Sequence, residues 1–129
     1  DIGYGDIDIL SPSSLETPAI DTLSGQSIRF TDFHVSPFCT PTRAALMTGN
    51  HPGYTGAYRT SSGRSMMHPD EKTIAHLFAE AGYATGMAGK WHLGEYFPSL
   101  PNAQGFDEYL GRHAGLTRTH LRVEAPRIR

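Results

Sequence analysis

The sequence predicts an α/β fold in which a mainly parallel sheet is flanked by helices. The first observation is an apolar stripe with the spacing i, i+3, i+4 and i+7. It predicts a helix with one buried face, capped by Asp70 and ended by Gly82. The second observation is the run of small and apolar residues at 83–88, which predicts a strand directly after that helix. Polar residues follow this strand, as is typical of a βα repeat. The stripe consists of Ile74, Leu77, Phe78 and Ala81.

The first third of the chain predicts another helix followed by another strand. Thr17 can cap the helix, Pro18 suits its first position and Gly25 can end it. Residues 27–35 then show the alternation of a strand. Between residues 50 and 69 the periodicity disappears and glycine, serine and tyrosine accumulate, which predicts a loop.

Composition limits the chain to at most one ordinary domain and excludes several classes of protein. The chain has 129 residues, 38% of them hydrophobic, and a net charge of −2. Such a charge indicates no bulk attraction to nucleic acid. The single cysteine excludes an internal disulfide, and no apolar run reaches the length of a membrane span. We therefore predict neither a nucleic-acid partner nor a membrane span.

The single cysteine, Cys39, lies where a further helix is expected to begin. Thr40 is the expected N-cap, Pro41 suits the first helical position, and Gly49 can end the helix. Unpaired N–H groups of a first turn attract anions, and Arg43 can add a positive charge on the same side. This combination predicts an oxyanion site in which Cys39 is a potential nucleophile.

Two other interpretations of Cys39 follow from its residue type. A lone cysteine is most often a small buried apolar residue. A helix N-terminus also lowers the pKa of a cysteine, as in the thiolate phosphatases. Those enzymes place the arginine further along the chain than the four residues that separate Cys39 from Arg43.

A second pair of candidate groups, Lys90 and His92, follows the strand predicted at 83–88. The two residues are two positions apart, so their side chains point to one side if the backbone is extended. Lysine supplies a point charge, and histidine can donate or move a proton near neutral pH. The pair therefore suits an anionic site, although alone it is more typical of a protein surface.

Two segments resemble the signatures of the type I sulfatases. Residues 39–43 resemble the Cys-x-Pro-x-Arg signature, and the Ala-Ala-Leu-x-Thr-Gly continuation follows it. Residues 82–94, from Gly-Tyr-Ala-Thr-Gly through Lys-Trp-His-Leu-Gly, resemble the second signature. The resemblance implies an alkaline-phosphatase-like sandwich and a sulfuric ester hydrolase of the arylsulfatase type. It also implies that Cys39 is oxidised to formylglycine, an aldehyde whose hydrate is the nucleophile, with Arg43, Lys90 and His92 as catalytic residues. Lys90 and His92 would bind the sulfate.

The same resemblance extends to the start of the chain and to a metal. The opening Asp-Ile-Gly-Tyr-Gly-Asp resembles the loop after an Asp-Asp pair in sulfatases, and Asp1 matches the second acid. This implies a Ca²⁺ cofactor with Asp1 and the formylglycine formed from Cys39 as ligands. Residues 1–111 are expected to be the N-terminal part of a catalytic domain whose first strand is missing. Residues 112–129 are expected to be a basic tail, and the isolated chain is expected to be inactive.

Partners and compartment are also implied by the resemblance alone. The expected partners are a small-molecule or carbohydrate sulfate ester and the machinery that generates formylglycine. The expected compartment is periplasmic, extracellular or lysosomal. Two alternatives stay open: a phosphate-ester or phosphonate hydrolase of the same superfold, and an inactive truncated remnant. Sulfate and phosphate are both tetrahedral oxyanions, so the pocket residues discriminate between them only weakly.

Overall fold

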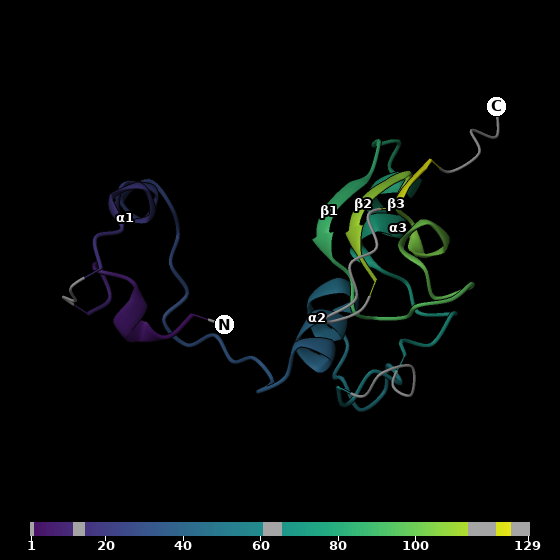
Figure 1. Ribbon diagram of the computed structural model, residues 1–129, viewed down its shortest axis with the longest axis horizontal. Helices are drawn as coiled ribbons and strands as arrows, with labels where there is room; N and C mark the ends of the chain where they lie inside the picture. Colours follow the sequence, from purple (N-terminus) through teal and green to yellow (C-terminus); the bar gives the residue numbers. More distant parts are fainter. Residues whose placement is uncertain (1, 12–14, 61–65, 114–120, 125–129) are drawn as a thin grey trace. The chain divides into compact units, whose positions relative to one another are not determined.

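The computed structural model describes residues 2–11, 15–60, 66–113 and 121–124, the last four by their backbone (Figure 1). The chain divides into two compact units, residues 1–34 and residues 35–129. Within the described ranges, none of the helices has the length and apolar character that crossing a membrane requires.

The first unit contains a short 3-10 helix and one α-helix. The 3-10 helix η1 covers Tyr4–Asp6, and the Asp6 carboxylate accepts a hydrogen bond of 2.7 Å from the Gly3 N–H. The α-helix α1 covers Pro18–Gly25, which confirms the predicted helix. Its Thr17 hydroxyl donates to the Asp21 carboxylate over 3.0 Å and accepts from the Asp8 N–H over 3.1 Å. These bonds tie the preceding loop to the start of α1.

The strand predicted at residues 27–35 is wrong, because the segment is in neither a strand nor a helix. A strand is defined by hydrogen bonds to a neighbour, and no described segment pairs with this one. Ile28 and Phe30, which carried the predicted alternation, are 88% and 75% exposed. The alternation was present in the sequence, but it did not produce a paired strand.

The second unit contains a three-stranded sheet with the order β1-β2-β3 (Figure 1). Strand β1 covers Gly86–Lys90, β2 covers Glu108–Arg112 and β3 covers Leu121–Glu124. β1 and β2 are parallel with Lys90 opposite Arg112, and β2 and β3 are antiparallel. The strand predicted at 83–88 therefore exists but begins and ends later. The parallel pair and the helices confirm the α/β class.

Helix α2 covers Cys39–Thr48 and begins two residues earlier than expected. The prediction that Thr40 is the N-cap is wrong: Phe38 holds that position in extended conformation, and Cys39 is the first helical residue. Pro41 is still within the first turn, where the missing N–H costs no intrahelical bond. Gly49 ends the helix with φ 72°, as expected. Cys39 therefore belongs to the first turn itself.

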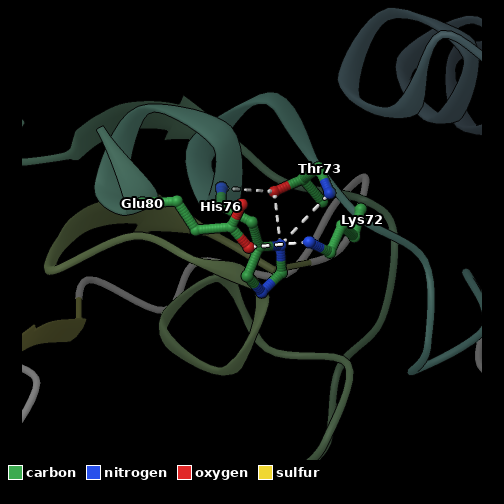
Figure 2. A network of polar contacts seen from close by, with 4 residues as sticks. All are labelled: Lys72, Thr73, His76 and Glu80. Atoms are coloured by element: carbon green, nitrogen blue, oxygen red, sulfur yellow. Dashed lines mark hydrogen bonds and ion pairs between the residues drawn. The ribbon is translucent and has the colours of Figure 1, made fainter. Parts of the chain in front are cut away.

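Helix α3 covers Ile74–Glu80, and its N-terminus is held by a polar network (Figure 2). The predicted cap Asp70 is wrong, because Thr73 is the N-cap and its hydroxyl accepts from the His76 N–H over 3.4 Å. The His76 Nδ1 in turn accepts from the Thr73 N–H over 3.1 Å. Lys72, which precedes the N-cap, donates to Glu80, the last residue of the helix, over 2.7 Å. Reciprocal bonds of this kind satisfy the free donors of a first turn.

The apolar stripe of α3 is not buried in this structure, so that part of the prediction is wrong. Ile74, Leu77 and Phe78 are all about half exposed, and the buried residue of the helix is Ala75. The backbone at Ala75 and His76 lies against Gly105, where an added Cβ would be 2.6 Å from the His76 nitrogen, so the close approach requires glycine. The helix therefore packs through its small residue, and its apolar stripe has no covering element among the described residues. Gly82 follows the helix with φ 86°, as expected of a stop signal.

The core of the second unit gathers around Trp91, which is fully buried. Its ring meets Phe106 edge-on at a centroid distance of 6.0 Å, and its Nε1 donates to the Ser99 carbonyl over 2.8 Å. Aromatic burial of this kind stabilises a small core strongly. The Asp107 carboxylate accepts a hydrogen bond from the Thr85 N–H over 2.8 Å, which ties the start of β2 to the residue before β1. The other core residues are Ala44, Ala57, Met67, Ala75, Leu93 and Tyr109.

Gly111 permits the close approach of β1 and β2, and its replacement by alanine is expected to destabilise the protein. An added Cβ would lie 1.7 Å from the Gly89 carbonyl oxygen, which is backbone and cannot move aside. We expect a loss of about 3 kcal/mol in the free energy of unfolding, measured by denaturant titration. Gly86→Ala is the matched control in β1, because nothing lies within 4 Å of a Cβ there. Equal stability of the two variants would contradict this account.

Candidate active site

Arg43 connects the first half of α2 to the end of β1. Its Nε donates to the Trp91 carbonyl over 2.6 Å, and a terminal nitrogen donates to the Lys90 carbonyl. An arginine has five donors in a rigid plane, so a fork onto two successive carbonyls fixes both the side chain and the backbone it holds. Arg43 thus fixes the backbone at the end of β1 with two hydrogen bonds, and its positive charge lies near the start of α2.

Lys90 lies beside Cys39, so the two segments that resemble the sulfatase signatures meet at this point. Partial burial raises the pKa of the Cys39 thiol, but hydrogen bonds from Lys90 and Thr60 and the charge of Lys90 outweigh it. The net effect is a pKa of Cys39 below its ordinary value. The environment of Cys39 therefore favours a negatively charged group at this position.

His92 stands next to the same positive charges. Burial, and then the charges of Lys90 and Arg43, lower the pKa of His92, while Glu95 opposes them. The imidazole is therefore neutral at pH 7 and can accept or donate a proton. Its Nδ1 is buried without a hydrogen-bond partner among the described residues.

The backbone at His92 differs from the expectation. β1 ends at Lys90, and His92 has φ 59°, the only positive φ of a described residue other than glycine. The extended alternation assumed for Lys90 and His92 therefore does not hold. Left-handed backbone at a residue other than glycine is strained and occurs often at functional sites. The His92 N–H donates to the His113 carbonyl over 2.8 Å, which anchors the strained residue.

Sequence reasoning missed two groups that contact this cluster. The Thr60 hydroxyl lies 3.8 Å from the Cys39 sulfur, and it comes from a loop without any local pattern. The Tyr109 hydroxyl donates to the Gly89 carbonyl over 3.1 Å. Tyr109 is also close enough to Arg43 for an ionised Tyr109 to raise the pKa of the guanidinium. Burial raises the pKa of Tyr109, so its hydroxyl stays protonated near neutral pH. No signal in the sequence distinguished Thr60 from its neighbours.

The predicted metal ligand Asp1 lies outside the described residues. Within the described ranges, no three side chains of the His, Cys, Asp and Glu types lie close enough to hold a metal ion together. The described part of the chain thus offers Cys39, Arg43, Lys90 and His92 as one cluster, without a complete metal site.

The contact between Lys90 and Cys39 predicts a pH effect on thiol reactivity. Only the thiolate is alkylated, so the alkylation rate of unconverted Cys39 should rise through a lower pH than for a free cysteine. Lys90→Met should move this midpoint to higher pH, because the hydrogen bond and the positive charge that favour the thiolate are lost. Lys72→Met, which removes a lysine paired with Glu80 instead, should leave it unchanged. A midpoint unaffected by Lys90→Met would contradict the contact.

An α/β fold with cationic groups and an activated residue at a helix start is typical of proteins that process oxyanion esters. The family model described as Sulfatase matches residues 1–125, and the chain therefore belongs to the sulfatase family.

Individual relatives agree with this assignment. The chain is 45% identical over 117 residues to arylsulfatase A of Homo sapiens, covering 86% of this chain and 23% of that protein. The solved structure titled Ps i-CgsB in complex with k-i-k-neocarrahexaose is 39% identical with a TM-score of 0.82. The alignment covers 89% of this chain and 26% of that chain.

A second solved structure, the PsFucS1 sulfatase from Pseudoalteromonas sp., is 34% identical with a TM-score of 0.78. The alignment covers 88% of this chain and 24% of that one. The chain thus spans about a quarter of the length of the relatives it matches. The likeness confirms the expected alkaline-phosphatase-like α/β fold.

Proposed function

We propose that the natural polypeptide carrying this sequence hydrolyses sulfate esters, with residue 39 as the nucleophile. The observation that carries the proposal is the convergence of Lys90, Arg43 and His92 at Cys39, the first residue of α2. Positive charges and free N–H groups at one point suit the charge that develops on a tetrahedral sulfate in the transition state. Residues 1–111 are proposed as part of the catalytic domain, with 112–129 as its tail.

The surroundings of Cys39 fit its conversion to formylglycine. The side chain is partly exposed at the helix start, and Lys90 and Thr60 offer hydrogen bonds to a polar atom there. The formylglycine hydrate supplies a hydroxyl nucleophile and a route to release the sulfate afterwards. Lys90 stabilises negative charge at residue 39 and on the sulfate, and Arg43 holds the backbone that carries Lys90. His92, neutral near pH 7, can take up and return a proton.

Sulfatases generally use a divalent metal in addition to formylglycine. We propose Ca²⁺ as that metal, with Asp1 and residue 39 as two of its ligands. A calcium ion takes six to eight oxygen ligands. The described residues alone do not make such a site, so the proposal for the metal rests on family membership and on the position of Asp1 in the sequence.

The substrate class follows from the relatives. One is an arylsulfatase, and one structural neighbour is a complex with k-i-k-neocarrahexaose. We propose an aryl or carbohydrate sulfate ester as the substrate, and the formylglycine-generating machinery as a partner. A periplasmic, extracellular or lysosomal compartment suits such substrates. The phosphate-ester alternative has less support, because the matching relatives are sulfatases.

Paired substrates test the proposal. The natural polypeptide, produced together with formylglycine-generating machinery and supplied with Ca²⁺, should hydrolyse an aryl sulfate faster than the matching aryl phosphate. The two esters share the same leaving group and shape, so the ratio of their kcat/KM values measures discrimination at the oxyanion. A preference for the phosphate would favour the alternative hydrolase, and hydrolysis of neither ester would favour an inactive remnant.

A further inference from the structure

The side chain of His113 is held by a stack on Tyr109. Its ring lies nearly parallel to the Tyr109 ring, with a centroid distance of 5.2 Å and an interplanar angle of 17°. Tyr109 is itself fixed, because it is 1% exposed and its hydroxyl donates to the Gly89 carbonyl over 3.1 Å. Burial lowers the pKa of His113, with Glu95 opposing it, so the stacked imidazole is neutral near pH 7. A stack of two neutral rings restricts the movement of both side chains.

The backbone of His113 holds His92, the proposed proton carrier of the site. The His113 carbonyl accepts a hydrogen bond of 2.8 Å from the His92 N–H, next to a bond of the same length from the Trp91 N–H to the Arg112 carbonyl. His92 has φ 59°, so its surroundings must keep it in a conformation that it does not prefer. A functional histidine is usually oriented by a hydrogen bond at its second ring nitrogen. The buried Nδ1 of His92 has no such partner among the described residues, so the bond to the His113 carbonyl takes over this role.

We propose that His113 is a positioning residue for His92: the stack on Tyr109 fixes the His113 carbonyl, and that carbonyl holds His92 in its left-handed conformation. This inference rests on the proposed function and adds to it a side chain that lies outside both sulfatase signatures. His113 also belongs to the segment 112–129 that is proposed as a tail. The start of that segment thus supports the site.

The test compares His113→Ala, which removes the stack, with His113→Phe, which keeps a flat neutral ring. Both variants keep the backbone carbonyl, so a difference between them measures the effect of the stack. The first readout is hydrogen exchange of the His92 amide in the natural polypeptide, followed by mass spectrometry of overlapping peptides. Exchange should be about fivefold faster in His113→Ala and within about twofold of wild type in His113→Phe. Peptides from α3 should exchange as in wild type in both variants, which shows that the fold is intact.

The second readout is kcat for an aryl sulfate, measured with the converted protein. His113→Ala should lower kcat about fivefold, because a misplaced catalytic group slows the reaction, and His113→Phe should keep most of kcat. If His113 acts through His92, then His113→Ala added to His92→Ala should lower kcat by less than about a further twofold. A mass spectrum of the residue 39 peptide must first show equal conversion in all the proteins compared.

Exchange of the His92 amide decides the inference. Unchanged exchange in His113→Ala overturns it, and so does equally fast exchange in His113→Phe, because the ring would then be irrelevant. Independent losses of kcat from the two histidines overturn it as well, since His113 would then not act through His92. If the wild-type protein hydrolyses no sulfate ester but exchange is faster in His113→Ala alone, the positioning of His92 is supported while the proposed function fails. The two failures are therefore distinguishable.

Discussion

Cys39→Ala is expected to lower kcat/KM for an aryl sulfate by about 10⁴-fold or more. Alanine cannot be converted to an aldehyde, so the variant lacks the nucleophile, while Lys90, Arg43 and His92 keep their places. Residual activity would come from oxyanion binding alone. Steady-state kinetics on the natural polypeptide measures the loss.

Leu46→Ala provides the matched control for this loss. Leu46 lies on the same helix and is 65% exposed, away from the buried face of α2. We expect kcat/KM within about twofold of wild type, as for most exposed substitutions. If Cys39→Ala retained substantial activity, residue 39 could not be the nucleophile, and the phosphatase-like and non-enzymatic interpretations would both have to be reconsidered.

Arg43→Lys is expected to lower kcat/KM by about 10²-fold although the charge is kept. The planar guanidinium holds the carbonyls of Lys90 and Trp91 together, and a single ammonium cannot reproduce that fork. Lys90 would then lose its fixed position relative to Cys39. The variant should also melt at a lower temperature, because Trp91 anchors the core.

Arg59→Lys is the matched control for Arg43→Lys. It shows whether a loss of activity comes from the two hydrogen bonds of Arg43 to the Lys90 and Trp91 carbonyls or from replacing any arginine by lysine. Arg59 lies with its guanidinium 5.7 Å from the centroid of the Tyr58 ring, in the exposed loop. Arg59→Lys should leave kcat within about twofold of wild type. An Arg43→Lys variant with unchanged kinetics and unchanged melting temperature would show that the fork onto the two carbonyls has no functional role.

Local signals predicted much of the fold. The Thr-Pro start and Gly end of α1, the Gly49 stop of α2 and the α/β order were all visible in the sequence. They depend on backbone chemistry within a few residues, and neighbours in space do not alter them. Helix starts were less accurate, because Phe38 and Thr73 took the cap positions expected of Thr40 and Asp70.

Features that depend on distant contacts were not predictable. The alternation at residues 27–35 could not show whether a partner strand would pair with it, and the stripe of α3 could not show what covers it. The cluster of candidate residues was predictable because two signatures named its members. Thr60 was not, because its contact with Cys39 joins residues 21 positions apart through a loop with no pattern of its own.

The most direct measurement is a mass spectrum of the peptide that contains residue 39, from the natural polypeptide in a preparation that hydrolyses an aryl sulfate. The account predicts that the thiol of Cys39 has been replaced by an aldehyde in the active fraction, and that activity rises with the fraction converted. Full activity with an unmodified thiol would contradict it.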